Sequence, residues 1–154
     1  MTCGCVLPNL YVGPSPADDD DFRELMELHV TAIVSVQTED DDSASAIERE
    51  RVTATAAALK FVHVPVTDFD SLELGRKLPR CVKVVEKLID SGEVVYLHCT
   101  AGMNRSPTVA VAYLHWCLQW PLEKAMEHMG ACRRCYPDEE AIRRASELRN
   151  RKAP

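Results

Sequence analysis

The segment comprising residues 98–107 (HCTAGMNRSP) contains a cysteine and an arginine at a spacing suited to phosphate chemistry. Five residues separate Cys99 from Arg105, so a loop can close and bring the guanidinium over the same centre as the sulfur. The planar guanidinium fits two oxygens of a phosphoryl group and the charge that spreads over them in the transition state. The pair therefore predicts nucleophilic attack on a phosphate ester, with Cys99 as the thiolate nucleophile.

The other residues of this segment are suited to bind an anion and to support the nucleophile. Gly102 allows a tight turn, and the N-terminus of the following helix adds a partial positive charge. The backbone N–H groups expected to bind the substrate phosphate are those of Thr100, Ala101, Gly102, Met103 and Asn104. Ser106 can donate its hydroxyl to the sulfur and ease the departure of the thiolate. His98 is expected to orient the loop through hydrogen bonds rather than to act as the acid.

Loss of an alkoxide or phenoxide from phosphorus also requires a proton donor. Asp68 is the candidate acid, because it lies 31 residues before Cys99 on a polar loop that follows the neighbouring predicted strand. Asp70 lies on the same loop, and the sequence alone leaves either carboxylate open. Phe69 lies between the two and is the best aromatic candidate for lining the cleft.

Short apolar runs alternate with helical patterns along the chain and predict the elements that would position these residues. Strands are predicted over residues 10–12, 31–36, 61–66 and 94–97. Helices are predicted over residues 22–30, 45–59, 78–90, 105–118, 121–129 and 137–149. This order predicts an α/β fold with a central, mostly parallel sheet of about five strands flanked by helices. The loop that starts with Cys99 then follows the carboxyl end of a central strand, where open α/β sheets place anion sites.

Length and composition narrow the class of protein. A chain of 154 residues with 46% hydrophobic residues has the size of one compact domain, which we expect to span residues 1–154. It contains no apolar run long enough to cross a membrane and no basic, apolar leader, so neither a membrane partner nor a secretory signal is expected. The net charge of −6 disfavours nucleic acid as a partner, because phosphate backbones require a basic face.

Seven cysteines, an odd number, predict free thiols and a reducing, cytoplasmic location rather than a disulfide framework. The C-x-C pair of residues 3–5 and the C-x-x-C pair of residues 132–135 could supply four zinc ligands. Neither pair lies in a zinc knuckle, so ordinary thiols are the preferred interpretation, and we expect neither a metal nor another cofactor. A thiolate at Cys99 would oxidise readily, with Cys81 or another thiol as a candidate disulfide partner.

The pattern H-C-x-x-G-x-x-R-S at residues 98–106 resembles the signature of cysteine-dependent phosphatases of the dual-specificity class. Residues 7–13 (LPNLYVG) resemble the start of that domain, and Asp68 matches the general acid of the family. The resemblance covers nearly the whole chain. It implies a cysteine-phosphatase-like fold and a metal-independent mechanism through a cysteinyl-phosphate. In that mechanism Asp68 protonates the leaving oxygen and then acts as the base for the water that hydrolyses the intermediate.

A narrower resemblance concerns the catalytic domains of plant glucan (starch) phosphatases. Residues 67–70 (TDFD), 99–103 (CTAGM) and 135–145 (CYPDEEAIRRA) carry it. Asn104 and Ser106 depart from it, because those enzymes have Gly before the arginine and usually Ala after it. The resemblance makes a phosphorylated glucan a second candidate substrate.

Three functions therefore remain open at this point. The first is hydrolysis of phosphotyrosine and of phosphoserine or phosphothreonine in proteins. The second is hydrolysis of a phosphorylated starch- or glycogen-like glucan, for which the aromatic residues that could stack on sugar rings are Phe69, Trp116, Trp120 and Tyr136. The third is a catalytically silent module that binds phosphorylated partners. The residues between Cys99 and Arg105 are uncharged, whereas the phosphoinositide phosphatases that the chain resembles in this motif place lysines there, so the resemblance disfavours a phosphoinositide.

Overall fold

The computed structural model describes residues 1–152 and contains one five-stranded sheet of order β1-β2-β5-β3-β4. The strands are β1 (Gly4–Leu7), β2 (Leu10–Gly13), β3 (Ala32–Ser35), β4 (Lys60–His63) and β5 (Val95–His98). β1 pairs with β2 in the antiparallel direction, and the other neighbouring strands are parallel. The predicted α/β fold with a mostly parallel sheet is therefore confirmed.

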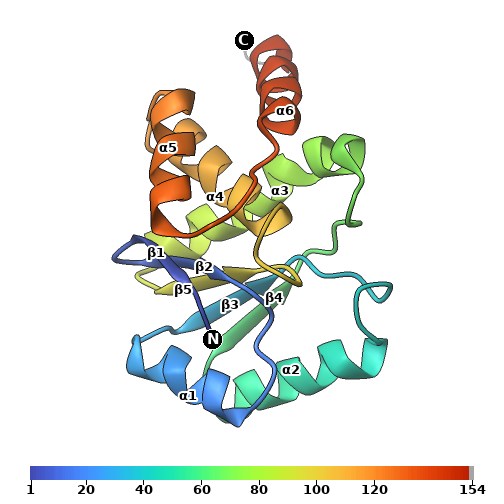
Figure 1. Ribbon diagram of the computed structural model, residues 1–154, viewed down its shortest axis with the longest axis vertical. Coiled ribbons are helices and arrows are strands. Elements are labelled where there is room, and N and C mark those ends of the chain that lie inside the picture. The colour runs from blue at the N-terminus through green and yellow to red at the C-terminus, as the bar shows by residue number, and fades with distance from the viewer. Residues whose placement is uncertain (153–154) are drawn as a thin grey trace.

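Helices cover both faces of this sheet (Figure 1). Two helices, α1 (Asp19–Glu27) and α2 (Ala44–Ala56), lie on one face. The other face carries α3 (Ser71–Asp90), α4 (Arg105–Trp116), α5 (Leu122–Cys132) and α6 (Glu139–Lys152). No helix within residues 1–152 combines the length and the apolar composition needed to cross a bilayer.

The core is divided by the sheet, and β5 and α4 lie at its centre. Val95 and Leu97 of β5 belong to the larger apolar cluster, whereas Tyr96 belongs to the smaller one on the opposite face, as the alternation of side chains along a strand requires. Helix α4 buries every residue from Arg105 to Leu114, because it packs between the sheet and the other helices of the larger layer. The loop between β5 and α4 is thus held at both ends by the most buried elements of the fold.

The structure adds one strand and moves several predicted boundaries. Helix α1 covers Asp19–Glu27 rather than residues 22–30, α2 ends three residues before its predicted limit, and α5 ends three residues after its own. β1 was not predicted, because a segment of four residues that begins with glycine gives little strand signal. It forms by antiparallel pairing with β2, and Gly4 lies close to the end of α5, where a Cβ would lie 2.8 Å from the carbonyl oxygen of Cys132. Helix α3 begins at Ser71 rather than at residue 78. The Asp70 side chain caps it by accepting a hydrogen bond from the Glu73 N–H at 2.9 Å, and the helix continues through Gly75 and Pro79.

Strand β4 ends at His63, three residues before the predicted limit. Residues 64–66 leave the sheet but stay beside β3, since the N–H of Val64 donates to the Ser35 carbonyl at 2.9 Å and that of Val66 to the Val36 carbonyl at 3.0 Å. These bonds bring the polar loop that starts at Thr67 to the carboxyl edge of the sheet, next to the ends of β3 and β5.

Candidate active site

The loop of residues 99–104 joins β5 to α4 at the carboxyl edge of the parallel strands, as predicted. Cys99 follows β5 directly and is only 3% exposed. Its Sγ lies 3.2 Å from the Oγ of Ser106 in the first turn of α4. The Asn104 side chain forms no capping hydrogen bond with α4 and donates instead to the Tyr136 carbonyl at 2.9 Å. The positive end of α4 therefore faces the loop without a carboxylate of its own to neutralise it.

Gly102 sets the shape of this loop. Its φ of +69° lies in the left-handed region that favours glycine, and a Cβ built there would lie 2.5 Å from the carbonyl carbon of Gly13. A backbone hydrogen bond from Ser15 to the Thr100 carbonyl, 3.0 Å long, adds a second tie to the same segment. The exit of β2 and the candidate catalytic loop are thus packed backbone against backbone, and no larger residue fits at position 102.

His98 supports the loop from beneath. The ring is fully buried, and its Nδ1 donates to the Cys99 carbonyl at 2.8 Å. Its Nε2 is 2.5 Å from Oε1 of Glu50, a buried residue of α2. These two contacts fix the orientation of the ring. Glu50 was missed by the sequence reasoning, because it lies on a helix 48 residues away with no motif around it.

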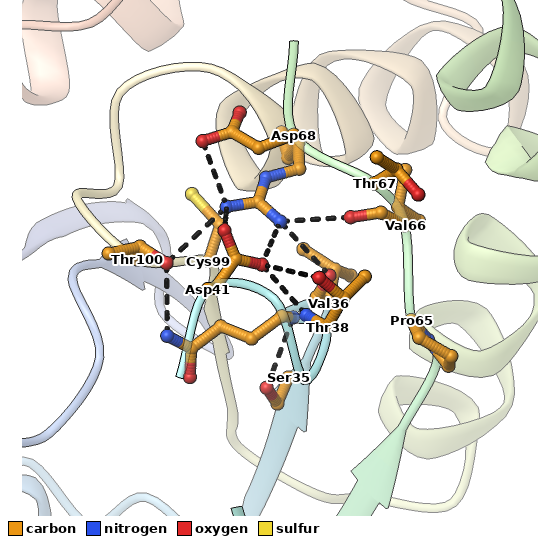
Figure 2. Close-up of polar contacts among 12 residues, drawn as sticks. Ser35, Val36, Thr38, Asp41, Pro65, Val66, Thr67, Asp68, Cys99 and Thr100 are labelled. Carbon is orange, nitrogen blue, oxygen red and sulfur yellow. Dashed lines mark hydrogen bonds and ion pairs between the residues drawn. The ribbon is translucent and has the colours of Figure 1, made fainter. Parts of the chain in front are cut away.

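Arg105 is held by a carboxylate that the sequence reasoning also missed. Its Nη1 donates to Oδ2 of Asp41 at 2.7 Å and to the Val66 carbonyl at 2.9 Å, and Nη2 donates to Oδ1 of Asp41 at 3.0 Å. Arg105 is 2% exposed. Asp41 and Val66 come from the loops after β3 and β4, so three strand ends meet at this guanidinium (Figure 2).

The remaining edge of the guanidinium has only long contacts or none. Nη2 lies 3.4 Å from Oγ1 of Thr100 and 3.3 Å from Oδ2 of Asp68. Within residues 1–152, Nε has no hydrogen-bond partner although it is buried. An unpaired buried N–H is costly, so this edge is suited to an oxyanion that would complete it.

Asp41 is itself held by its own loop. Oδ2 accepts from the backbone N–H of Thr38 at 2.7 Å and from its hydroxyl at 3.1 Å. Burial alone would raise the pKa of Asp41, but the hydrogen bonds from Arg105 and Thr38 and the guanidinium charge outweigh it, so the pKa lies below its usual value. Only the strand order of the structure points to this residue, because β3 and β5 are neighbours and the loops that follow them must therefore lie side by side.

The structure separates the two aspartates that the sequence left open. Asp68 faces the guanidinium of Arg105 and is partly exposed, so it can also meet a leaving group. Asp70 instead caps α3 with its carboxylate. The geometry therefore favours Asp68 over Asp70 as the acid.

Two of the four candidate aromatic residues adjoin residues of the candidate site. Phe69 adjoins Asp68, is 99% exposed and has a φ of +59°, a strained value for a side chain of its size. Tyr136 donates its backbone N–H to the Met103 carbonyl at 2.6 Å and is 60% exposed. Trp116 and Trp120 lie elsewhere, because Trp116 bonds to Ser146 of α6 and Trp120 packs on His128 of α5.

The cysteines other than Cys99 do not form a cation site in the part of the chain that the structure describes, where no group of three or more His, Cys, Asp or Glu side chains is arranged to hold a metal ion. Burial raises the pKa of the thiols of Cys3, Cys132 and Cys135. Burial in the core also raises the pKa of Cys81 to about 12, so that thiol is a poor attacking group for disulfide exchange at neutral pH.

Comparison with known families identifies the class. Residues 10–150 match the dual specificity phosphatase catalytic domain, so the chain belongs to that family. The solved structures of PTPMT1 and of human DUSP28 share the fold, with TM-scores of 0.75 and 0.73 and sequence identities of 19% and 21%. The alignments cover 97% and 98% of this chain and 95% of each of those chains.

Relatives with higher identity point to particular branches of the family. The chain is 30% identical to the chloroplastic phosphoglucan phosphatase LSF1 of Arabidopsis thaliana and 30% identical to laforin of Mus musculus. It is 29% identical to dual specificity protein phosphatase 5 of Homo sapiens. These alignments cover 89%, 92% and 80% of this chain, but only 24%, 47% and 29% of the relatives, so the chain spans less than half of their length.

Proposed function

We propose that this chain is a cysteine-dependent phosphatase that hydrolyses phosphomonoesters through a cysteinyl-phosphate intermediate. The observation that carries the proposal is the convergence of three loops at one edge of the sheet: Cys99 and Arg105 bound the loop after β5, Asp68 from the loop after β4 lies 3.3 Å from Arg105, and Nε of Arg105 is buried without a hydrogen-bond partner within residues 1–152. Membership of the phosphatase family supports it.

In the first step the Cys99 thiolate attacks phosphorus, and the bond from phosphorus to the leaving oxygen breaks. The equatorial oxygens are bound by the backbone N–H groups of residues 100–104 and by Nε and Nη2 of Arg105. Asp68 transfers its proton to the leaving oxygen, which departs as an alcohol or phenol. The products are the free alcohol and a phosphoryl group bonded to sulfur.

In the second step Asp68, now a carboxylate, removes a proton from a water molecule as its oxygen attacks phosphorus. The phosphorus–sulfur bond breaks, inorganic phosphate leaves and the Cys99 thiolate is restored. The Ser106 hydroxyl, 3.2 Å from Sγ, donates a hydrogen bond to the departing sulfur and stabilises its charge. Neither a metal nor a cofactor takes part in the proposed steps.

The proposed substrates are phosphotyrosine and phosphoserine or phosphothreonine residues of proteins. A cleft of about 460 Å³ reaches the loop at Thr100. Among its carboxylates, Asp41 and Glu50 bond to Arg105 and His98, which leaves Asp18, Asp19 and Asp42 against Arg49. Such a lining would repel a second phosphate group, which favours singly phosphorylated substrates. Neither nucleic acid nor a membrane is part of this proposal, and the cytoplasmic location stays a prediction from cysteine usage.

A phosphorylated glucan is the second candidate substrate. The names of LSF1 and of the amyloplastic phosphoglucan phosphatase DSP4 of Castanea sativa support it, at 30% and 29% identity. Phe69, next to Asp68, and Tyr136, whose backbone bonds to Met103, are exposed and could stack on sugars. Trp116 and Trp120 are poorer candidates, because they contact Ser146 of α6 and His128 of α5.

Turnover of an aryl phosphate tests the proposal against the alternative of a silent phosphate-binding module. We expect hydrolysis that is insensitive to a metal chelator and abolished by vanadate or by alkylation of Cys99. Reduced, folded protein without turnover would support the silent module instead. Phosphate release from a phosphotyrosine peptide, a phosphoserine peptide and solubilised phosphoglucan by one preparation then ranks the substrates.

A further inference from the structure

The guanidinium of Arg105 divides into an end held by the protein and an edge left for a ligand. Of its five N–H groups, the two on Nη1 are directed at Asp41 and at the Val66 carbonyl, with the Val36 carbonyl also 3.5 Å from Nη1. One N–H of Nη2 bonds to the second oxygen of Asp41. The second N–H of Nη2 has only the longer contacts with Thr100 and Asp68, and Nε has no partner among residues 1–152. Together they form the edge of the fork that matches two phosphoryl oxygens.

Figure 2 shows how these contacts are arranged. Cys99 and Thr100 lie on one side of the Asp41 carboxylate, and Val66 lies on the other. Because Nη1 bonds to Val66 and Nη2 contacts Thr100, the Nη2 edge is the one directed towards the sulfur. Asp41 thus holds the end of the guanidinium and leaves the edge that faces the nucleophile open.

We propose that Asp41 is a positioning residue that orients Arg105 for binding the substrate phosphoryl group and the transition state. This proposal rests on the proposed function. Thr38 holds the Asp41 carboxylate through two hydrogen bonds, so the support reaches back to the loop backbone. Without Asp41, the nearest carboxylate to the guanidinium is that of Asp68. An ion pair between Arg105 and Asp68 would then keep Arg105 from binding the phosphate and Asp68 from acting as the acid.

The contact between Asp41 and Arg105 could also mean that Asp41 competes with the substrate, which predicts the opposite effect of its removal on phosphate binding. If Asp41 occupied the place of the substrate phosphate, its removal would free Arg105 and tighten anion binding. The hydrogen bonds argue against such competition. Asp41 accepts from Nη1 and Nη2, at the end of the guanidinium, and not from Nε, which would bind the phosphate. The sign of the change in phosphate affinity therefore decides between positioning and competition.

The test compares Asp41→Asn with Asp40→Asn, which removes the same charge from an exposed neighbouring residue. For Asp41→Asn we expect kcat/KM for an aryl phosphate to fall about 10- to 100-fold, largely in kcat, and the Kd of inorganic phosphate, measured by calorimetry, to rise about tenfold. Asp40→Asn should change neither quantity more than about twofold. Tighter phosphate binding by Asp41→Asn would overturn the proposal.

A double-mutant cycle with Arg105→Lys separates positioning from a general loss of structure. If Asp41 acts through the guanidinium fork, Asp41→Asn should lower kcat/KM less than about threefold in the Arg105→Lys background. An equal loss in both backgrounds would overturn the proposal. Should Asp41→Asn fail to fold, Thr38→Val, which removes only the 3.1 Å hydroxyl contact with Asp41, is expected to give a smaller loss in the same direction, and no loss would count against the proposal.

Phosphate binding keeps this test independent of catalysis. If the wild-type protein binds phosphate without turning over an aryl phosphate, the proposed function fails, but weaker binding by Asp41→Asn still supports the positioning role. If the wild type is active and Asp41→Asn matches it in kcat/KM and in phosphate affinity, the proposed function stands and the role of Asp41 is rejected.

Discussion

Two loops leave neighbouring parallel strands at the same edge of the sheet, and they differ in how clearly their sequences indicate a role. The loop of residues 99–104 after β5 lies within a recognisable motif, whereas residues 37–43 after β3 show only acidic and polar side chains. In the structure both loops contribute contacts to the same guanidinium. A residue that reacts can be recognised from its local sequence, but a residue that holds it is recognised only once the strand order is known.

The largest expected effect concerns the nucleophile in the loop after β5. Cys99→Ser should lower aryl phosphatase turnover at least about 1,000-fold, because the serine hydroxyl is not ionised at neutral pH. Phosphate binding should persist, since Arg105 and the loop N–H groups are unchanged. Cys5→Ser is the control, because Cys5 is exposed on β1, and it should keep full turnover. Retained turnover in Cys99→Ser would remove the basis of the proposed mechanism.

The second effect compares the two aspartates of the loop after β4. Asp68→Asn should lower kcat about 100-fold for substrates with poor leaving groups and much less for good ones, because only poor leaving groups need the proton. Asp70→Asn should change neither kcat nor stability appreciably, since asparagine also caps helices well. The measurement is a series of aryl phosphates of increasing leaving-group pKa. The reverse pattern would assign the acid to Asp70.

The third effect concerns how the catalytic loop is packed. Comparing Gly92 with Gly102, which both have positive φ, separates the backbone strain of an added side chain from its steric collision with neighbouring atoms. Gly92→Ala meets only the backbone strain, since nothing lies within 4 Å of its added Cβ, and should cost about 1 kcal/mol of unfolding free energy. Gly102→Ala adds a collision with the backbone of Gly13 and should cost about 3 kcal/mol. Urea unfolding gives both values. Equal costs would mean that the loop can move away from β2.

Gly102→Ala should also lower turnover, because a displacement of about 1 Å in the groups that bind the phosphate can cost about 100-fold in rate. Gly92 lies in the turn after α3, so Gly92→Ala should leave kcat unchanged. A Gly102→Ala protein with normal kcat would show that the loop tolerates rearrangement.

Much of the fold followed from the sequence because its signals are local. The apolar runs and helical patterns located four of the five strands and each of the six helices within residues 1–152. β1 gives little such signal, because it has only four residues and begins with a glycine, which lies close to the end of α5. The start of α3 was missed because Gly75 and Pro79 are typical helix breakers, and only the cap by Asp70 shows that the helix begins before them.

The candidate site divides in the same way. The motif indicated Cys99 and Arg105, but Asp41 and Glu50 lie 64 and 48 residues from the partners that they contact. Nothing around either acid distinguishes it from a solvated surface residue. Likewise, the sequence could not separate Tyr136 from Trp116, because the distinction rests on contacts with distant residues: Trp116 bonds to Ser146 of α6, whereas the backbone of Tyr136 bonds to Met103 in the loop after β5.

The smallest expected effect is on the pH dependence of stability, and it tests the loop after β3 without any substrate. The pKa of Asp41 is below its usual value: burial alone would raise it, but the hydrogen bonds from Arg105 and Thr38 outweigh that effect. A carboxyl group with a depressed pKa in the folded state contributes stability above its unfolded pKa, about 3.9, and loses it as the pH falls through the folded value.

The difference in unfolding free energy between the wild type and Asp41→Asn should therefore be largest near neutral pH and should shrink below about pH 4. Urea unfolding at several values between about pH 7 and pH 3 measures it. Asp40→Asn should show no comparable narrowing, because that side chain is exposed. A difference that stays constant over this range would mean that Asp41 contributes through its shape and neutral hydrogen bonds, and that its charge does not hold Arg105 in place.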